Sequence, residues 1–246
     1  MHRFAPVIWT VFVLLAVTLA CSSGATPQPT VVPPTETRLP TKTPTSTPSP
    51  TATPNVPATQ LAEELNSLLR EYEEKGYIAS TEGSFSEVEP FNEQWAQIGW
   101  FNSWLYDEVV SDFVLKGHFS WSTALDTRDP SGCGVVFGAQ GNGDYYVVFL
   151  DKARLIFLMK RGFNLYPIGR TRGPGRTNFG NPAEAEVIIA VRGEQTFVSV
   201  DGEVTEYTLP VTQTTTGRFG FSLLSGTNRD YGTRCEITGI LLWTPE

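Results

Sequence analysis

The chain is poor in the residues that most often carry catalytic or metal chemistry. Its 246 residues include 2 histidines and 3 cysteines. Beyond the first few residues only His118 remains, which excludes a site built on several histidine ligands and leaves a Ser-His-Asp triad one possible base. We interpret His118 as a surface residue on the polar face of a strand. No Cys-x-x-Cys pair and no Gly-Lys-Ser/Thr sequence occurs, so a dithiol redox site and a nucleotide-binding P-loop are also excluded.

Positive charge is scarce as well. The chain carries 18 Lys and Arg against 26 Asp and Glu, a formal charge of −8, so its overall field does not favour nucleic acid or an anionic membrane as a partner. Seven basic residues nevertheless fall within 25 residues, 152–176, that contain no acid. The glycine-rich loop 169–176 would present Arg170, Arg172 and Arg176, whose guanidinium groups suit carboxylate, sulfate or phosphate. A plain solvated loop is the alternative.

The apolar run at the N-terminus is too short to span a bilayer comfortably. Phe4 to Ala20 falls below the roughly 20 residues required, and Arg3 precedes it. This order is typical of an export signal, here residues 1–20. Thr18-Leu19-Ala20-Cys21 resembles a bacterial lipobox, except that Thr18 stands where leucine is usual. The resemblance implies lipidation of Cys21, a lipid anchor as the only membrane contact, and a place on the outer face of the membrane. Ordinary secretion, with cleavage after Ala25, is the alternative.

Residues 21–58 alternate proline with threonine and serine and contain almost no large apolar residues. Such a segment cannot bury a core, so we predict a disordered, extended stalk. The composition fits an O-glycosylated stalk or a plain spacer.

A helix and one further domain follow the stalk. Leu61, Leu65, Leu68 and Tyr72 recur at helical spacing, which predicts an amphipathic helix over 59–76 that docks by one edge. The remainder, 77–246, is enough for a single domain. Its two cysteines, Cys133 and Cys235, predict a disulfide, because exported chains mature in oxidising compartments.

The pattern changes to a period of two after the helix. Residues 113–121 alternate apolar and polar side chains, as a strand with one buried face requires. Eight similar runs follow, and their connections include Asp201-Gly202, a two-residue hairpin turn. Many short strands without intervening helices predict an all-β, antiparallel sandwich.

Two stretches carry a family resemblance. Residues 131–138 with 144–150, and residues 186–193 with 200–202 and 217–221, resemble the central strands and hairpins of concanavalin A-like jelly rolls, particularly the laminin-G-like and keto-disaccharide-hydrolase-like group. The resemblance implies a jelly-roll β-sandwich. Its members include glycan-binding modules, adhesion domains and glycoside hydrolases, so it does not select a function.

Catalysis finds little support in the sequence. The Glu-x-Asp-x-x-Glu strand common in jelly-roll glycanases is absent, and the nearest pair of acids on one strand face is Glu184 with Glu186. A retaining glycosidase needs its two carboxyl groups about 5 Å apart. A solvated strand edge is the alternative interpretation of this pair.

Calcium is a further hypothesis, since laminin-G-like domains sometimes bind it through loop oxygens. Asp and Asn are also favoured in turns for backbone reasons. The candidate ligands in inferred loops are Asp126, Asp129, Asn142, Asp144, Asn228 and Asp230.

Aromatic residues gather before the first clear strand, among them Trp95, Trp100 and Trp104. Indole rings can stack on sugars, and packing in the core is the alternative. The sequence as a whole predicts a noncatalytic module that binds a glycan or another cell-envelope polymer. A glycoside hydrolase with a nonstandard acidic pair and an adhesive module with a protein partner remain the alternatives.

Overall fold

The structure is a computed structural model and describes residues 56–152, 154–170 and 180–246, with side chains from Gln60 onward. One helix is followed by thirteen strands in this part of the chain. The elements are α1 (Val56–Glu74), β1 (Gly83–Val88), β2 (Phe91–Trp95), β3 (Trp100–Val110), β4 (Phe113–Thr123), β5 (Gly132–Ala139), β6 (Tyr145–Asp151), β7 (Arg154–Arg161), β8 (Asn164–Arg170), β9 (Ala183–Arg192), β10 (Gln195–Val200), β11 (Glu203–Thr208), β12 (Gly217–Ser225) and β13 (Thr233–Pro245).

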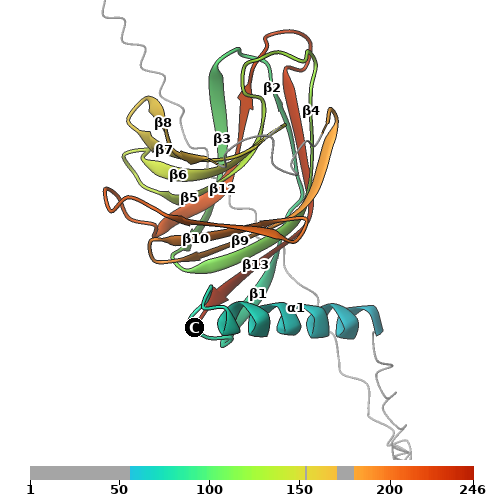
Figure 1. Cartoon of the computed structure of the whole chain (residues 1–246), viewed down its shortest axis with the longest axis vertical. Coiled ribbons are helices and arrows are strands. Elements are labelled where there is room, and N and C mark those ends of the chain that lie inside the picture. The colour runs from blue at the N-terminus through green and yellow to red at the C-terminus, as the bar shows by residue number, and fades with distance from the viewer. Residues whose placement is uncertain (1–55, 153, 171–179) are drawn as a thin grey trace, which may run out of the picture. The chain divides into compact units, whose positions relative to one another are not determined.

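The strands form two antiparallel sheets packed face to face (Figure 1). The first, sheet A, has the order β1-β13-β4-β9-β10-β11, with β2 also paired to β13. The second, sheet B, has the order β3-β12-β5-β6-β7-β8. Each sheet mixes strands that are distant in sequence, as in a jelly roll. The predicted all-β, antiparallel jelly-roll sandwich is confirmed.

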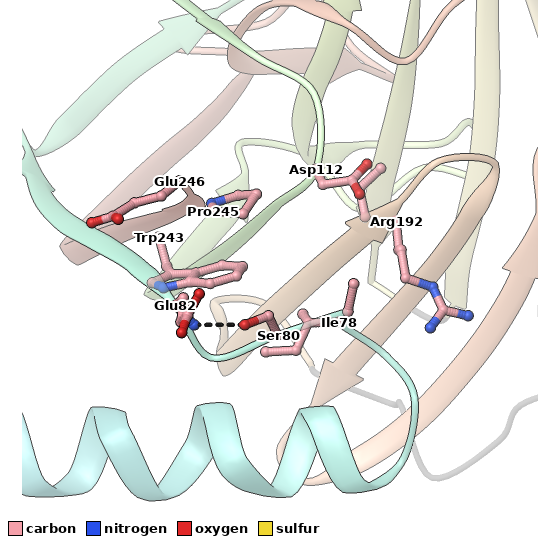
Figure 2. Close-up of a pocket in the computed structure, with 10 residues that line it drawn as sticks. Ile78, Ser80, Glu82, Asp112, Arg192, Trp243, Pro245 and Glu246 are labelled. Carbon is pink, nitrogen blue, oxygen red and sulfur yellow. Dashed lines mark hydrogen bonds between the residues drawn. The ribbon is translucent and has the colours of Figure 1, made fainter.

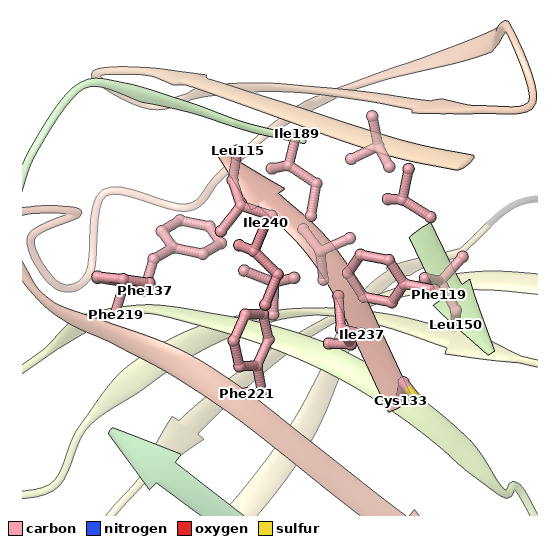
Figure 3. Packing of buried hydrophobic residues seen from close by; sticks show 14 of the residues in the cluster. Leu115, Phe119, Cys133, Phe137, Leu150, Ile189, Phe219, Phe221, Ile237 and Ile240 are labelled. Carbon is pink, nitrogen blue, oxygen red and sulfur yellow. The ribbon is translucent and has the colours of Figure 1, made fainter. Parts of the chain in front are cut away.

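The core lies between the two sheets and follows from the alternation in the sequence. On β4, Phe113, Leu115, Phe119 and Trp121 are buried, whereas the residues between Leu115 and Trp121 on the other face are half-buried. Figure 3 shows side chains of both sheets meeting in this layer, including Phe137 and Phe221 from sheet B. Burial of this apolar surface is the main favourable term in folding.

The predicted disulfide is present in this core. Cys133 on β5 and Cys235 on β13 are bonded, with their Cα atoms 5.9 Å apart. Because β5 belongs to sheet B and β13 to sheet A, the bond joins the two sheets and closes a loop across a sequence separation of 102.

Helix α1 packs on the outer face of sheet A. Leu69 and Tyr72 are buried against Val114, Phe197 and Trp243 in an apolar cluster outside the main core. The helix runs from Val56 to Glu74, whereas the predicted range was 59–76. It ends before Gly76, whose φ of +74° is left-handed and stops the helix.

The predicted stripe of the helix needs one correction. Leu61 is 39 % exposed, and Leu69 takes the buried position instead. A salt bridge of 2.6 Å between Glu64 and Lys116 of β4 adds a polar contact between the helix and the sheet.

The Asp201-Gly202 turn has the backbone conformation that its sequence predicts. Asp201 and Gly202 both have positive φ, 49° and 85°, as a two-residue hairpin between β10 and β11 requires.

Gly232 is expected to tolerate no side chain. Its φ is +67°, and a β-carbon there would overlap the backbone of Trp95. We expect Gly232→Ala to lower the free energy of unfolding by about 3 kcal/mol, from left-handed strain plus overlap. Gly193→Ala is the matched control, because Gly193 has φ +56° with open space around it, and should cost about 1 kcal/mol. Urea unfolding measures both losses, and an equal loss of unfolding free energy in Gly232→Ala and Gly193→Ala would contradict this account.

Several predictions fall outside the described residues. They concern the export signal 1–20, the lipidation of Cys21, most of the stalk 21–58, and Arg172 and Arg176. Within the described part of the chain, no helix is long and apolar enough to cross a membrane.

Candidate functional site

The outer face of sheet B is hollowed. A depression of about 420 Å³ is lined by residues of β3, β6, β7, β8 and β12 and of the connections that flank them. Its lining residues are Gly99, Trp100, Phe101, Pro130, Phe149, Ile156, Leu158, Phe163, Asn164, Leu165, Pro167 and Leu224. We call this depression the sheet B hollow.

The strand register explains why these residues meet. Phe149 on β6 lies opposite Ile156 on β7, and Leu158 on β7 lies opposite Pro167 on β8. Alternate residues of a strand point to opposite faces, so these side chains share the outer face while Leu150 and Leu155 enter the core. The floor of the hollow is therefore apolar.

Two aromatic side chains stand at the rim of the hollow. Trp100 is 58 % exposed at the start of β3, and Phe163 is 96 % exposed in the β7–β8 turn. Ile98, next to Gly99, is 49 % exposed as well. Large apolar side chains gathered in one exposed region are typical of interaction sites.

The three tryptophans predicted as sugar contacts are in different environments. Trp100 lines the hollow, as a stacking residue would have to. Trp104 is half-buried with its ring 5.5 Å from that of Phe91, so it belongs to the packing of the core. Trp95 is half-buried too and donates its indole N–H to the carbonyl of Trp100 over 3.1 Å. This bond helps to fix the backbone at Trp100.

Polar groups on the outer face of sheet B lie mostly at its margins. The hydroxyls of Ser103 and Tyr145 form a hydrogen bond of 2.7 Å. Burial raises the pKa of Tyr145 to about 12, so this hydroxyl stays protonated at neutral pH. Lys160 donates to the carbonyl of Gly143 over 2.6 Å and lies 5.1 Å from the ring centre of Tyr145.

Positive charge collects along the β7–β8 edge of this face. Arg154 contacts the buried carboxylate of Asp151 over 3.5 Å. Arg170 pairs with Ile156 in the β7–β8 register and is exposed. The structure corrects the predicted loop here, since Gly169 and Arg170 belong to β8 and the loop begins after them.

The acidic pair Glu184 and Glu186 lies on the other side of the domain. Both are exposed on the outer face of β9, in sheet A. Glu186 contacts His118 of β4, with 2.8 Å between Oε1 and Nδ1. His118 is therefore at the surface, as predicted, and the acids belong to an exposed polar face rather than to the sheet B hollow.

Two of the acids considered for calcium, Asp126 and Asp144, make contacts within the protein. Lys152 contacts Asp126, and Asp144 accepts a hydrogen bond of 2.8 Å from the backbone of Gly162. Asn142 bonds Asp144 within its own turn. Among the residues that the structure describes, no group of three or more His, Cys, Asp or Glu side chains could hold a metal ion.

A second hollow, of about 210 Å³, lies near the end of α1 (Figure 2). Ile78, Ser80 and Glu82 of the α1–β1 connection line it, together with Trp243 of β13. Trp243 is only 2 % exposed, so its ring belongs to the packing beneath the helix rather than to an open platform.

No protein-family model matches the sequence, and no curated protein matches it. Solved structures with a similar arrangement include the carbohydrate binding module CBM66 from Bacillus subtilis, with a TM-score of 0.46, 11 % identity, and 65 % of this chain and 95 % of that one covered. The exoplasmic/lumenal domain of VIP36, in a Ca²⁺- and Man3GlcNAc-bound form, has a TM-score of 0.45 and 13 % identity, with 67 % of this chain and 82 % of that one covered. Chicken galectin 2 has a TM-score of 0.40 and 12 % identity, with 56 % of this chain and 95 % of that one covered.

Proposed function

We propose that this protein is a carbohydrate-binding module whose ligand lies across the outer face of sheet B. The observation that carries the proposal is the sheet B hollow, with the exposed ring of Trp100 at its rim and Arg154 and Arg170 on the same face. Indole rings stack on the apolar faces of sugar rings, and guanidinium groups form paired hydrogen bonds with carboxylate and sulfate. Acidic glycans, carrying uronic acid or sulfate, are the preferred ligands.

The dimensions of the face suit an oligosaccharide. β3, which carries Trp100, and β7, which carries Arg154, are separated by β12, β5 and β6. Four strand spacings amount to roughly 19 Å, which is longer than one sugar ring. A short chain of sugars could therefore contact the aromatic rim at one end and the arginines at the other.

Helix α1 does not cover the face of the domain that carries the hollow. Helix α1 begins at Val56, directly after the Pro/Thr tract, and packs on the outer face of sheet A. The sheet B hollow faces the opposite way.

Binding is noncatalytic in this proposal. The acids that could serve as a hydrolytic pair, Glu184 and Glu186, are on the outer face of sheet A. Asp151, the buried acid of sheet B, is held by Arg154.

A glycan array tests the proposal. The purified chain should retain uronic-acid or sulfated oligosaccharides more strongly than neutral ones, and retention should fall as salt rises, because ions screen exposed charges. No reducing sugar should be released. Retention of no glycan at any salt concentration would overturn the proposal.

Lipid attachment at Cys21 is the remaining part of the proposal, and it would place the module on the outer face of the membrane. We expect Cys21→Ser to abolish partitioning of the processed protein into a detergent phase, because serine has no thiol to carry the lipid. Unchanged partitioning of a correctly cleaved Cys21→Ser protein would mean that Cys21 carries no anchor.

A further inference from the structure

The floor of the sheet B hollow offers few hydrogen-bonding groups to sugar hydroxyls. Phe149, Ile156, Leu158, Leu165 and Leu224 occupy most of it. A hydroxyl pressed against such a floor would lose its water without gaining a partner, which is unfavourable. The part of a ligand that enters the hollow is therefore expected to be apolar.

The polar groups nearby do not change this conclusion. The hydroxyls of Ser103 and Tyr145 are bonded to each other. The carboxylate of Asp151 is engaged by Arg154. Of the described residues that line the hollow, Asn164 alone has an amide side chain. An apolar group thus fits the hollow better than a second sugar ring does.

The rim continues the apolar character of the floor outward. Phe163 is 96 % exposed at a turn that Gly162, with φ +57°, makes possible, and Trp100 is 58 % exposed. A tight turn does not require an aromatic residue at an exposed position. An apolar group of the ligand that lies between Phe163 and the floor would contact the Phe163 ring, which explains an aromatic residue at this position.

Charge at the edge of the face defines the other end of the ligand. Arg170, exposed on β8, lies in register with Ile156 of the floor, and Arg154 lies two residues before Ile156 on β7. Among the described residues, no acidic side chain lines the hollow itself. A ligand with an anionic group next to its apolar group complements this combination.

We infer that the ligand is an amphiphile: an acidic glycan that carries an acyl, alkyl or aryl substituent, with the substituent in the sheet B hollow and the acidic group at Arg154 and Arg170. This inference rests on the proposed function and narrows its ligand class.

Three glycosides test the inference: methyl glucuronide, octyl glucuronide and octyl glucoside. They are titrated below their micellar concentrations into the full chain carrying Cys21→Ser, so that the protein has no lipid of its own. Amide shifts in NMR spectra give the dissociation constants. Octyl glucuronide should bind at least tenfold more tightly than methyl glucuronide, because the octyl chain leaves water. It should also bind several-fold more tightly than octyl glucoside, which lacks the carboxylate.

A surface variant distinguishes binding of the octyl chain in the hollow from nonspecific hydrophobic binding. Phe163→Ala should reduce the affinity advantage of octyl glucuronide over methyl glucuronide by about fivefold. Tyr166→Ala is the control, since Tyr166 is a 45 % exposed aromatic residue of the same hairpin outside the lining of the hollow. It should change neither affinity.

The outcomes are distinguishable. Equal binding of the two glucuronides would overturn the inference while leaving the proposed function standing. Equal binding of octyl glucoside and octyl glucuronide would overturn the role of the arginines. Binding of none of the three, together with an empty glycan array, would overturn the proposed function as well.

Discussion

Replacing both cysteines with alanine is expected to lower the free energy of unfolding by about 2–5 kcal/mol. The bond between Cys133 and Cys235 closes a loop across 102 residues and joins sheet B to sheet A. Without it the unfolded chain gains much freedom. Alanine is chosen because both cysteines are fully buried, and a serine hydroxyl there would add a desolvation cost. For a domain of this size, the melting temperature should fall by about 10 °C.

Reduction of the disulfide is the matched control for the double alanine variant. Reduction should lower the melting temperature of the wild-type protein towards that of the Cys133→Ala/Cys235→Ala variant, and it should leave the variant unchanged. In the denatured but unreduced wild-type protein, neither cysteine should react with an alkylating reagent. Two labelled cysteines under those conditions would refute the bond.

Trp100→Ala is expected to have the largest effect on binding. The exposed indole at the rim of the hollow is the best platform for a sugar ring on this face, and an aromatic residue that anchors a ligand is typically worth about 2 kcal/mol, or roughly a 30-fold change in Kd. The melting temperature should stay nearly constant, because Trp100 is 58 % exposed.

Val109→Ala is the control for Trp100→Ala. Val109 lies on the same strand, is 63 % exposed and is not among the residues that line the hollow. Its affinity for acidic oligosaccharides should match that of the wild-type protein. An unchanged Kd for Trp100→Ala, measured by calorimetry, would exclude Trp100 from the site.

Strands at the centre of the sheets were predictable, and those at the edges were largely not. On β4 one face is covered by the core, so polar and apolar residues alternate clearly. β1, β2, β3 and β8 are edge strands, and the sequence pattern predicted none of them. β8 contains Pro167, which an edge strand tolerates because one side of its backbone needs no partner. β11 is also an edge strand, but the Asp201-Gly202 turn made it predictable.

The site was less predictable than the fold. The aromatic cluster pointed to Trp100, but the sequence could not tell it apart from Trp104, which packs inward. The floor of the hollow was missed because β6 and most of β7 are buried on both faces. Continuous apolar runs of this kind do not reveal which residues face outward. Only the register of β6 with β7 places Phe149 beside Ile156, on the face that Leu158 shares.

The most direct test of the central claim is to map the bound ligand on the protein. An acidic oligosaccharide, selected from the glycan array, is titrated into the isotopically labelled protein, and the backbone amide shifts are followed by NMR. We predict that the largest shifts occur around Trp100, in the outer face of β6 and β7, and at Arg170. Shifts confined to the outer face of sheet A, around His118 and Glu186, would contradict the account.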